Sequence, residues 1–428
     1  MQKEMKDSRI DWVKQIPAHW KIHPVYSYFN ERKNKNSLGK ENNLLSLSYG
    51  RIIRKNINTT EGLLPKSFNT YHIVEAGDII IRPTDLQNDK RSLRTGLVKE
   101  HGIITSAYID LAPKKVLDSR YFHYLLHSYD ISKVFYNMGN GVRQSLSFPE
   151  FSHLMMIEPP FEEQKQIADF LDHKCDEIDA LHADIEKQIA TLEEYKKSII
   201  TEAVTKGLNP GVEMKDSGIE WCPSIPKHWI KTNPKFLFSL RNQKALPGEQ
   251  QLTASQKYGI IAQDEFMKIE NQQLVTVTKD FSILKHVEPN DFVISMRSFQ
   301  GGLEYSKLRG CISSAYVMLI PNSKKVYPPF YKWFFKSTKY INALQSTTNL
   351  VRDGQAMRYA NFIQIPLFII PISEQQEIAD YLDQKTTEID SIISAKKQQL
   401  DVLENYKKSL IYEYVTGKKE VPSYANAE

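Results

Sequence analysis

The chain has 428 residues, of which 41% are hydrophobic and 25% charged, and its formal net charge is +5. This length exceeds one compact core and predicts two or three globular domains. The sequence contains no run of 18 apolar residues, and its three cysteines are far apart, which argues against a membrane span and a disulfide framework. The first residues lack the apolar core of a secretory signal, so we expect a cytoplasmic protein.

The chain opens with a segment that recurs. "DSRIDWVKQIPAHW" at 7–20 returns as "DSGIEWCPSIPKHW" at 216–229, at a constant offset of 209. A second repeat relates 162–199 to 373–410 at an offset of 211, with 18 identities in 38 positions and no gap. These repeats predict an internal duplication, in which each copy has a globular domain followed by a repeated helix.

The repeats also set the expected boundaries. Residues 1–15 form an N-terminal segment, which we expect to dock near the end of the distal helix, because its second copy follows the first repeated helix. Residues 16–159 form the first globular domain and 160–215 the central repeated helix. Residues 216–370 hold the second copy of the opening segment and the second globular domain, and 371–428 form the distal repeated helix.

The two globular domains combine short β-rich runs with short helical runs, which is typical of α/β or α+β domains. Residues 16–159 contain 19 basic against 13 acidic residues, and 225–370 contain 19 against 9. The central segment 160–224 has the opposite balance, with 7 basic and 15 acidic residues. Basic domains with Arg, Gln, Asn, Ser and Tyr in their loops are typical of nucleic-acid binding.

The repeated segments predict long amphipathic helices that end at Gly207 and Gly417. Each has an apolar row at heptad spacing, and we assign a second row to positions such as Leu181, Tyr195, Ile392 and Tyr406. We expect the helices to pack antiparallel as a coiled coil; the alternative is that each packs on its own domain. The predicted helix–helix seam consists of Leu171, Ile178, Ile185, Leu192 and Ile199 with Leu382, Ile389, Leu403 and Leu410.

Candidate DNA-reading side chains are arginines, glutamines and a tyrosine close to glycines and turn residues, because such groups recognise base edges in the major groove. In the first domain they are Tyr49, Arg51, Arg54, Arg82, Arg91, Arg94, Arg143 and Gln144. In the second they are Arg241, Gln243, Arg297, Gln300, Arg309, Arg352 and Arg358. The alternative for any one of them is a surface ion pair.

No catalytic residues and no metal ligands are predicted. The sequence has no GxxxxGK[ST] loop, no GxGxxG after a strand and no HExxH. His19 and His228 recur beside tryptophan, where packing or capping is expected rather than acid–base chemistry. Asp179 and Asp390 also recur, and we interpret them as solvated or partner-facing charges.

"PPFEEQKQIADFLDHKCDEID" (159–179) and "PISEQQEIADYLDQKTTEID" (371–390) resemble the central and distal regions of the specificity subunits of type I restriction–modification systems. The resemblance implies two target-recognition domains separated by two long antiparallel helices, and an asymmetric bipartite target in double-stranded DNA. It also implies two modification subunits that carry S-adenosylmethionine and, in many members, two restriction subunits that carry ATP. The specificity subunit itself has no cofactor and no catalytic activity.

Two other classes of protein stay open at this point. One is a coiled-coil scaffold in which the basic charge is incidental. The other is a nuclease or methyltransferase without a recognisable motif.

Overall fold

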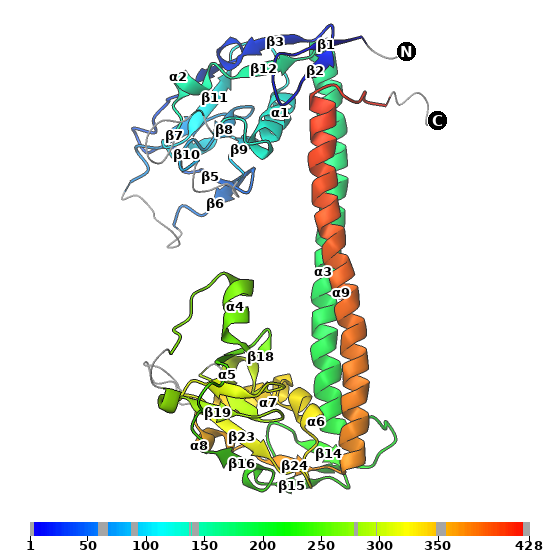
Figure 1. Ribbon diagram of the computed structural model, residues 1–428. Coiled ribbons are helices and arrows are strands. Elements are labelled where there is room, and N and C mark those ends of the chain that lie inside the picture. Colours follow the sequence, from blue (N-terminus) through cyan, green and yellow to red (C-terminus); the bar gives the residue numbers. More distant parts are fainter. Residues whose placement is uncertain are drawn as a thin grey trace. The chain divides into compact units, whose positions relative to one another are not determined.

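The computed structural model describes residues 4–58, 67–86, 93–136, 138, 145–277, 281–296, 298–347 and 357–422. The chain divides into two compact units: unit 1 consists of 1–185 and 398–428, and unit 2 of 186–397. Each unit contains a globular domain and part of two long helices, α3 (Phe161–Lys206) and α9 (Ile372–Val415) (Figure 1). The predicted α+β class with an internal repeat is confirmed. None of the described helices has the length and apolarity that a membrane span requires.

The domain of unit 1 is built from two four-stranded sheets and two antiparallel strand pairs. One sheet has the order β6-β5-β10-β7 and the other β4-β11-β8-β9, while β1 pairs with β2 and β3 with β12. The strands are β1 (Met5–Asp7), β2 (Gln15–Pro17), β3 (Lys21–Pro24), β4 (Phe29–Glu31), β5 (Leu44–Ser48), β6 (Arg51–Lys55), β7 (His72–Val74), β8 (Ile79–Ile81), β9 (Thr95–Leu97), β10 (Gly102–Ile104), β11 (Ile109–Pro113) and β12 (Met155–Glu158); the helices are α1 (Ser119–Ile131) and α2 (Phe148–Phe151).

The domain of unit 2 repeats this plan. The sheet of order β16-β23-β20-β21 corresponds to β4-β11-β8-β9. The pairs β13-β14 and β15-β24 correspond to β1-β2 and β3-β12. The strands are β13 (Met214–Asp216), β14 (Ser224–Pro226), β15 (Ile230–Thr232), β16 (Phe238–Arg241), β17 (Leu252–Ser255), β18 (Gly259–Ala262), β19 (Lys285–Val287), β20 (Phe292–Ile294), β21 (Glu304–Tyr305), β22 (Gly310–Ile312), β23 (Val317–Pro321) and β24 (Leu367–Ile369). The helices are α4 (Gln263–Glu270), α5 (Ser298–Gly301), α6 (Pro328–Phe334), α7 (Thr338–Ser346) and α8 (Tyr359–Phe362).

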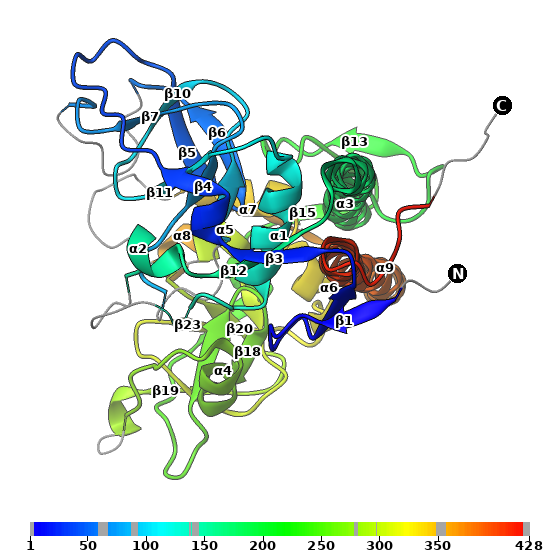
Figure 2. The ribbon, with the colours of Figure 1, turned by 90° about the horizontal axis from the view of Figure 1, so that it is seen from above.

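The long helices run antiparallel to each other within each unit, where they lie side by side (Figures 1 and 2). In unit 1, Lys407 Nζ of α9 lies 2.6 Å from Asp179 Oδ1 of α3. In unit 2, Lys196 of α3 binds Asp390 of α9, also at 2.6 Å. The two ion pairs are equivalent in the repeat, since both partners are related by the offset of 211. Asp179 and Asp390 therefore both bind across the helix pair. Asp390 is also 57% exposed, as expected of a solvated charge, whereas Asp179 is 34% exposed and is bound by Lys407.

The burial of side chains between the two long helices agrees with the first apolar row expected from the sequence and differs from the second. The first row is buried or half-buried at every position: Leu171, Ile178, Ile185, Leu192, Ile199, Leu382, Ile389, Leu403 and Leu410. In the row assigned beside it, Leu181, Tyr195, Ile392 and Tyr406 are about half exposed. The second buried row lies four residues after the first and includes Cys175, Ile189 and Ile393. Ile167 and Ile378, the first members of the expected second row, are buried, but at Leu181 and Ile392 and beyond the expected row lies one position too early.

The recurring opening segment binds the start of a long helix in each unit through hydrogen bonds. In unit 1, Trp20 Nε1 donates to Glu163 Oε2 (2.9 Å), and a ring nitrogen of His19 lies 2.7 Å from Oε1. In unit 2, Trp229 donates to Glu374 at 3.1 Å and His228 lies 2.7 Å from it. Both tryptophans are buried, and each glutamate stands in the first turn of its helix, where a negative charge is favoured. The recurring histidines therefore orient a carboxylate.

The same segment also binds the end of the other long helix. In unit 1, Lys418 Nζ donates to the backbone oxygens of Val13 (3.0 Å) and Gln15 (2.8 Å), just after α9. Tyr412 Oη donates to the Trp12 carbonyl at 3.2 Å. The N-terminal segment thus lies against the end of the distal helix, and one short stretch of chain holds the start of α3 and the end of α9 together.

A buried glutamine at the start of each long helix attaches the globular domain through backbone groups. Gln164 accepts from the Asp118 N–H (3.1 Å) and donates to the Pro159 carbonyl (2.9 Å). Gln375 accepts from the Tyr327 N–H and donates to the Ile370 carbonyl, both at 2.8 Å. The docking of each domain on its helix therefore uses the same contacts in both units.

We expect Gly417→Ala to lower the stability of unit 1. Gly417 has a φ of +68°, and a methyl group there would lie 2.5 Å from Pro17 Cδ. The left-handed backbone alone costs an alanine about 1–2 kcal/mol, and the overlap with Pro17 adds to this. Thermal unfolding measures the effect. Gly211→Ala is the matched control, because Gly211 has no positive φ and its nearest neighbour is Asn209 Oδ1 at 3.4 Å. Equal melting temperatures of the two variants would contradict the close packing of Gly417 on Pro17.

Unit 1 contains a pair of buried carboxyl groups where unit 2 has one. Asp78 binds Arg32 (Nε–Oδ2 2.8 Å), as Asp291 binds Arg241 in unit 2. Asp110, on the neighbouring strand β11, is also buried, whereas Met318 stands at this place in β23. Burial, together with the negative charge of Asp78, raises the pKa of Asp110 to about 8.

The raised pKa of Asp110 predicts that unit 1 is stabilised at low pH. The folded state binds this proton more tightly than the unfolded chain, so the contribution is complete below about pH 4 and is lost as pH rises through about 8. Each tenfold difference in proton affinity corresponds to about 1.4 kcal/mol. Urea unfolding at pH 5 and pH 8 should show this loss in the wild type and a smaller one in Asp110→Asn. An unchanged pH dependence in the variant would contradict the assignment.

Candidate DNA interface

The hairpin β5–β6 brings three of the predicted DNA-reading residues together in unit 1. Ser48 pairs with Arg51, so Tyr49 and Gly50 form a two-residue turn, and both have positive φ (46° and 77°). Such a turn matches the twist of a hairpin and favours glycine, whereas a tyrosine there is unusual. The Tyr49 side chain is 87% exposed at the tip. Arg51 and Arg54 follow on β6, so the hairpin presents an aromatic ring and two cations.

Both arginines of this hairpin are exposed and pair with carboxylates. Arg51 Nη2 lies 2.5 Å from Asp179 Oδ2 on α3, and Arg54 pairs with Glu100. Their side chains are 69% and 65% exposed. Exposed ion pairs contribute at most about 1 kcal/mol, so these pairs would yield to a phosphate or a base at little cost.

Unit 2 has an equivalent hairpin, β17–β18, whose residues are not among the predicted DNA-reading side chains. Tyr258-Gly259 repeats Tyr49-Gly50 at the offset of 209, and Gly259 also has a positive φ (71°). Lys257 at the tip is exposed, with its ammonium 4.7 Å from the centre of the Tyr258 ring. The Tyr-Gly dipeptide at the repeat offset was the signal that could have identified Lys257 and Tyr258.

Arg94 is not available for DNA. It is completely buried, and its guanidinium donates to the carbonyls of Thr84 (2.5 Å) and Asp85 (2.9 Å) and to Tyr136 Oη (3.0 Å). The prediction that Arg94 reads a base is therefore wrong: the side chain fixes the loop after β8. Arg82 in that loop is half-buried, and its N–H donates to the Arg94 carbonyl.

Arg241 also has a structural role. Its side chain is 17% exposed and binds Asp291 with two hydrogen bonds, of 2.6 Å and 3.0 Å. Arg32 and Asp78 form the same pair in unit 1, at 2.8 Å and 3.1 Å. A contact that both domains share cannot distinguish their targets, so Arg241 is not expected to read a base.

The other described candidates of unit 2 are exposed but scattered. Gln243 lies after β16, Gln300 in α5 and Arg358 immediately before α8, and all three are exposed. Arg309, before β22, is 60% exposed and lies 3.5 Å from Glu288. The remaining candidates, Arg91, Arg143, Gln144, Arg297 and Arg352, lie outside the described residues.

The described residues offer positive charge and stacking surfaces, with no group of three or more His, Cys, Asp or Glu arranged to hold a metal ion. Arginines can bind phosphates and guanine edges, and an exposed tyrosine can stack on bases. This chemistry fits recognition of a nucleic acid.

Comparisons with known proteins agree with this chemistry. Residues 52–191 match the family model described as the type I restriction modification DNA specificity domain. The chain is 26% identical over 316 residues to the putative type I restriction enzyme MjaX specificity subunit of Methanocaldococcus jannaschii, covering 72% of this chain and 70% of that one. It is 25% identical over 332 residues to the MjaVIII specificity subunit of the same organism, covering 75% of each.

Two solved structures share the fold. One comes from work on complex assembly and conformational transition of the type I R-M system, with a TM-score of 0.68, 12% identity and coverage of 94% of this chain and 99% of that chain. The other is the HsdS subunit from Thermoanaerobacter tengcongensis, with a TM-score of 0.51, 12% identity and coverage of 94% and 98%. At this identity the likeness concerns the fold.

The two roles of arginine in unit 1 predict opposite outcomes of mutation. We expect Arg94→Met to lower the free energy of unfolding by about 3 kcal/mol, because it leaves buried carbonyl groups without a donor. Arg54→Met should change it by less than about 0.5 kcal/mol, since the side chain is exposed. Denaturant titration compares the two variants. Equal stability of both would show that Arg94 is not a core contact.

Proposed function

We propose that this chain, a member of the specificity subunits of type I restriction–modification systems, is the DNA sequence-recognition subunit of such a complex. Specificity subunits are not catalytic, and modification and cleavage are carried out by other subunits. The single observation that carries the proposal is the match of residues 52–191 to a DNA specificity domain, because that range contains most of β6 with the exposed Arg54 and begins immediately after Arg51.

The duplication supports a target in two parts. Each unit has a basic domain with one four-stranded sheet of the same order and with a hairpin that ends in Tyr-Gly. The hairpins differ in the cations that they present: Arg51 and Arg54 in unit 1, Lys257 in unit 2. Two domains with different side chains would read two different half-sites, so the proposed target is asymmetric and bipartite.

The partners and cofactors follow from the family. We propose that two modification subunits bind this chain and carry S-adenosylmethionine, and that two restriction subunits with ATP join them in a complete complex. This chain would hold no cofactor of its own. The target is genomic DNA, which puts the proposed complex in the cytoplasm.

Base-by-base mapping of DNA methylation in cells with and without this chain tests the function. Deletion should remove methylation at one asymmetric, interrupted motif, and the wild-type gene should restore it. Methylation that is unchanged after deletion would contradict the proposal.

Variants at the hairpin tips test the division of the target between the units. We expect the double variant Arg51→Ala, Arg54→Ala to relax or lose the sequence requirement in one half of the motif, because one good bidentate contact is worth about 1–3 kcal/mol. Lys257→Ala should affect the other half only. If both variants weaken methylation equally at all sites, the side chains contact phosphates instead of bases.

A further inference from the structure

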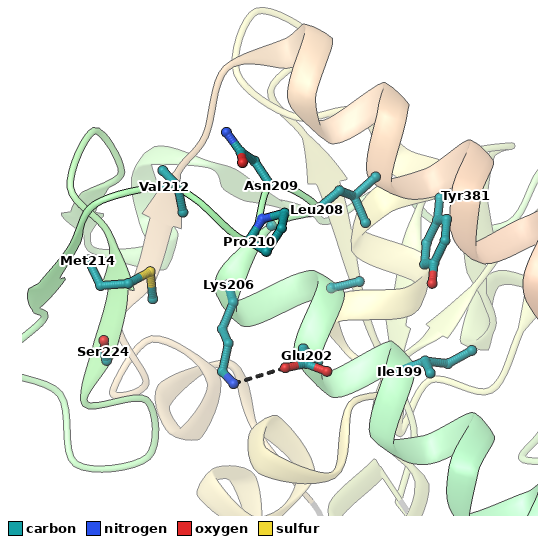
Figure 3. Close-up of a pocket in the computed structure, with 12 residues that line it drawn as sticks. Ile199, Glu202, Lys206, Leu208, Asn209, Pro210, Val212, Met214, Ser224 and Tyr381 are labelled. Atoms are coloured by element: carbon teal, nitrogen blue, oxygen red, sulfur yellow. Dashed lines mark hydrogen bonds and ion pairs between the residues drawn. The ribbon is translucent and has the colours of Figure 1, made fainter.

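A pocket of about 610 Å³ lies in unit 2 where α3 ends (Figure 3). Ile199 and Ala203 of α3 line it together with Leu208, in the connector after the helix, and Tyr381 of α9. Figure 3 shows Tyr381 and Leu208 on the side of the pocket next to α9. At its rim, Lys206 binds Glu202 at 3.0 Å. The pocket thus has an apolar wall, an aromatic ring and a charged edge.

The equivalent place in unit 1 is filled by a pair of aromatic rings. At the repeat offset of 211, Ala203 corresponds to Tyr414 and Tyr381 to Phe170. In unit 1, the rings of Tyr414 and Phe170 lie 4.4 Å apart at 35°, and both side chains are buried. Unit 2 therefore keeps one ring of this pair and has a methyl group in place of the other.

The loss of one ring leaves apolar surface that a ligand can cover. An aromatic pair contributes about 0.5–1.5 kcal/mol beyond the apolar area that it buries. Tyr381 is half-buried and has no such partner from position 203, and Leu208 beside it is 38% exposed. A ring supplied by another molecule would restore the stacking that Tyr414 provides within unit 1.

We propose that this pocket binds an aromatic side chain of a partner polypeptide. The charge around it favours a basic partner: Glu202 lines the pocket, residues 186–224 of unit 2 include seven acidic against five basic residues, and the negative end of the α3 dipole lies at the pocket. A nucleobase would bring phosphates to this acidic region and is disfavoured. Resting on the proposed function, we take the partner to be the modification subunit, with a Phe, Tyr or Trp next to a Lys or Arg.

The test fills the pocket with the ring that unit 1 uses. Ala203→Tyr in the full-length chain should weaken binding of one of the two purified modification subunits at least tenfold, as measured by calorimetry, because unit 1 already fills the equivalent place with Tyr414. DNA binding should not change, and the melting temperature should not fall, because Tyr414 is accommodated at the equivalent position. Ala203→Ser keeps the pocket open and should bind like the wild type.

A second variant keeps the test decisive if Ala203→Tyr is unstable. Tyr381→Leu removes the stacking face and should weaken the modification subunit by about threefold to tenfold, the equivalent of the aromatic pair energy. Wild-type affinity in Ala203→Tyr and Tyr381→Leu would overturn the aromatic site but leave the proposed function intact. If the wild-type chain does not bind the modification subunit at all, the partner assignment fails in both proposals.

Discussion

In each unit, a glutamate in the first turn of a long helix accepts a hydrogen bond from a buried tryptophan and lies against a histidine. The rest of the unit depends on this contact, because it fixes where the chain enters the domain relative to the helix pair. The glycine that ends the other helix packs on the same segment: Gly417 lies against Pro17 and Trp20, and Gly207 against Trp229 and Glu374. The recurrence of the opening motif is thereby explained: each copy joins the start of one helix to the end of the other.

The repeats made the plan of the fold predictable, since two copies of a sequence specify two copies of a structure. The apolar row at heptad spacing was also predictable, because leucine or isoleucine occupies every position of it except Lys396. The second buried row of each long helix was not predictable from the sequence. Leu181 and Tyr195 are as apolar as the residues that are buried, and only the packing geometry shows that the row containing Cys175 and Ile189 faces the partner helix.

The candidate interface was less predictable, because an arginine near a turn has the same local sequence whether it faces solvent or the core. Arg94 and Arg54 illustrate this: Arg94 ties a loop to Tyr136, whereas Arg54 stands exposed on a hairpin. The side chains that pair with them, Tyr136 with Arg94 and Glu100 with Arg54, lie more than 40 residues away in the chain. The structural role of Arg241 is visible once its pairing with Asp291 is compared with that of Arg32 and Asp78.

The buried glutamines Gln164 and Gln375 attach each domain through hydrogen bonds to its backbone N–H and C=O groups instead of to its side chains. A peptide group is present whatever residue occupies the position. A substitution on the surface of either domain therefore leaves these particular hydrogen bonds in place. One pair of helices can in this way carry two domains whose surfaces differ, as the two units of this chain do.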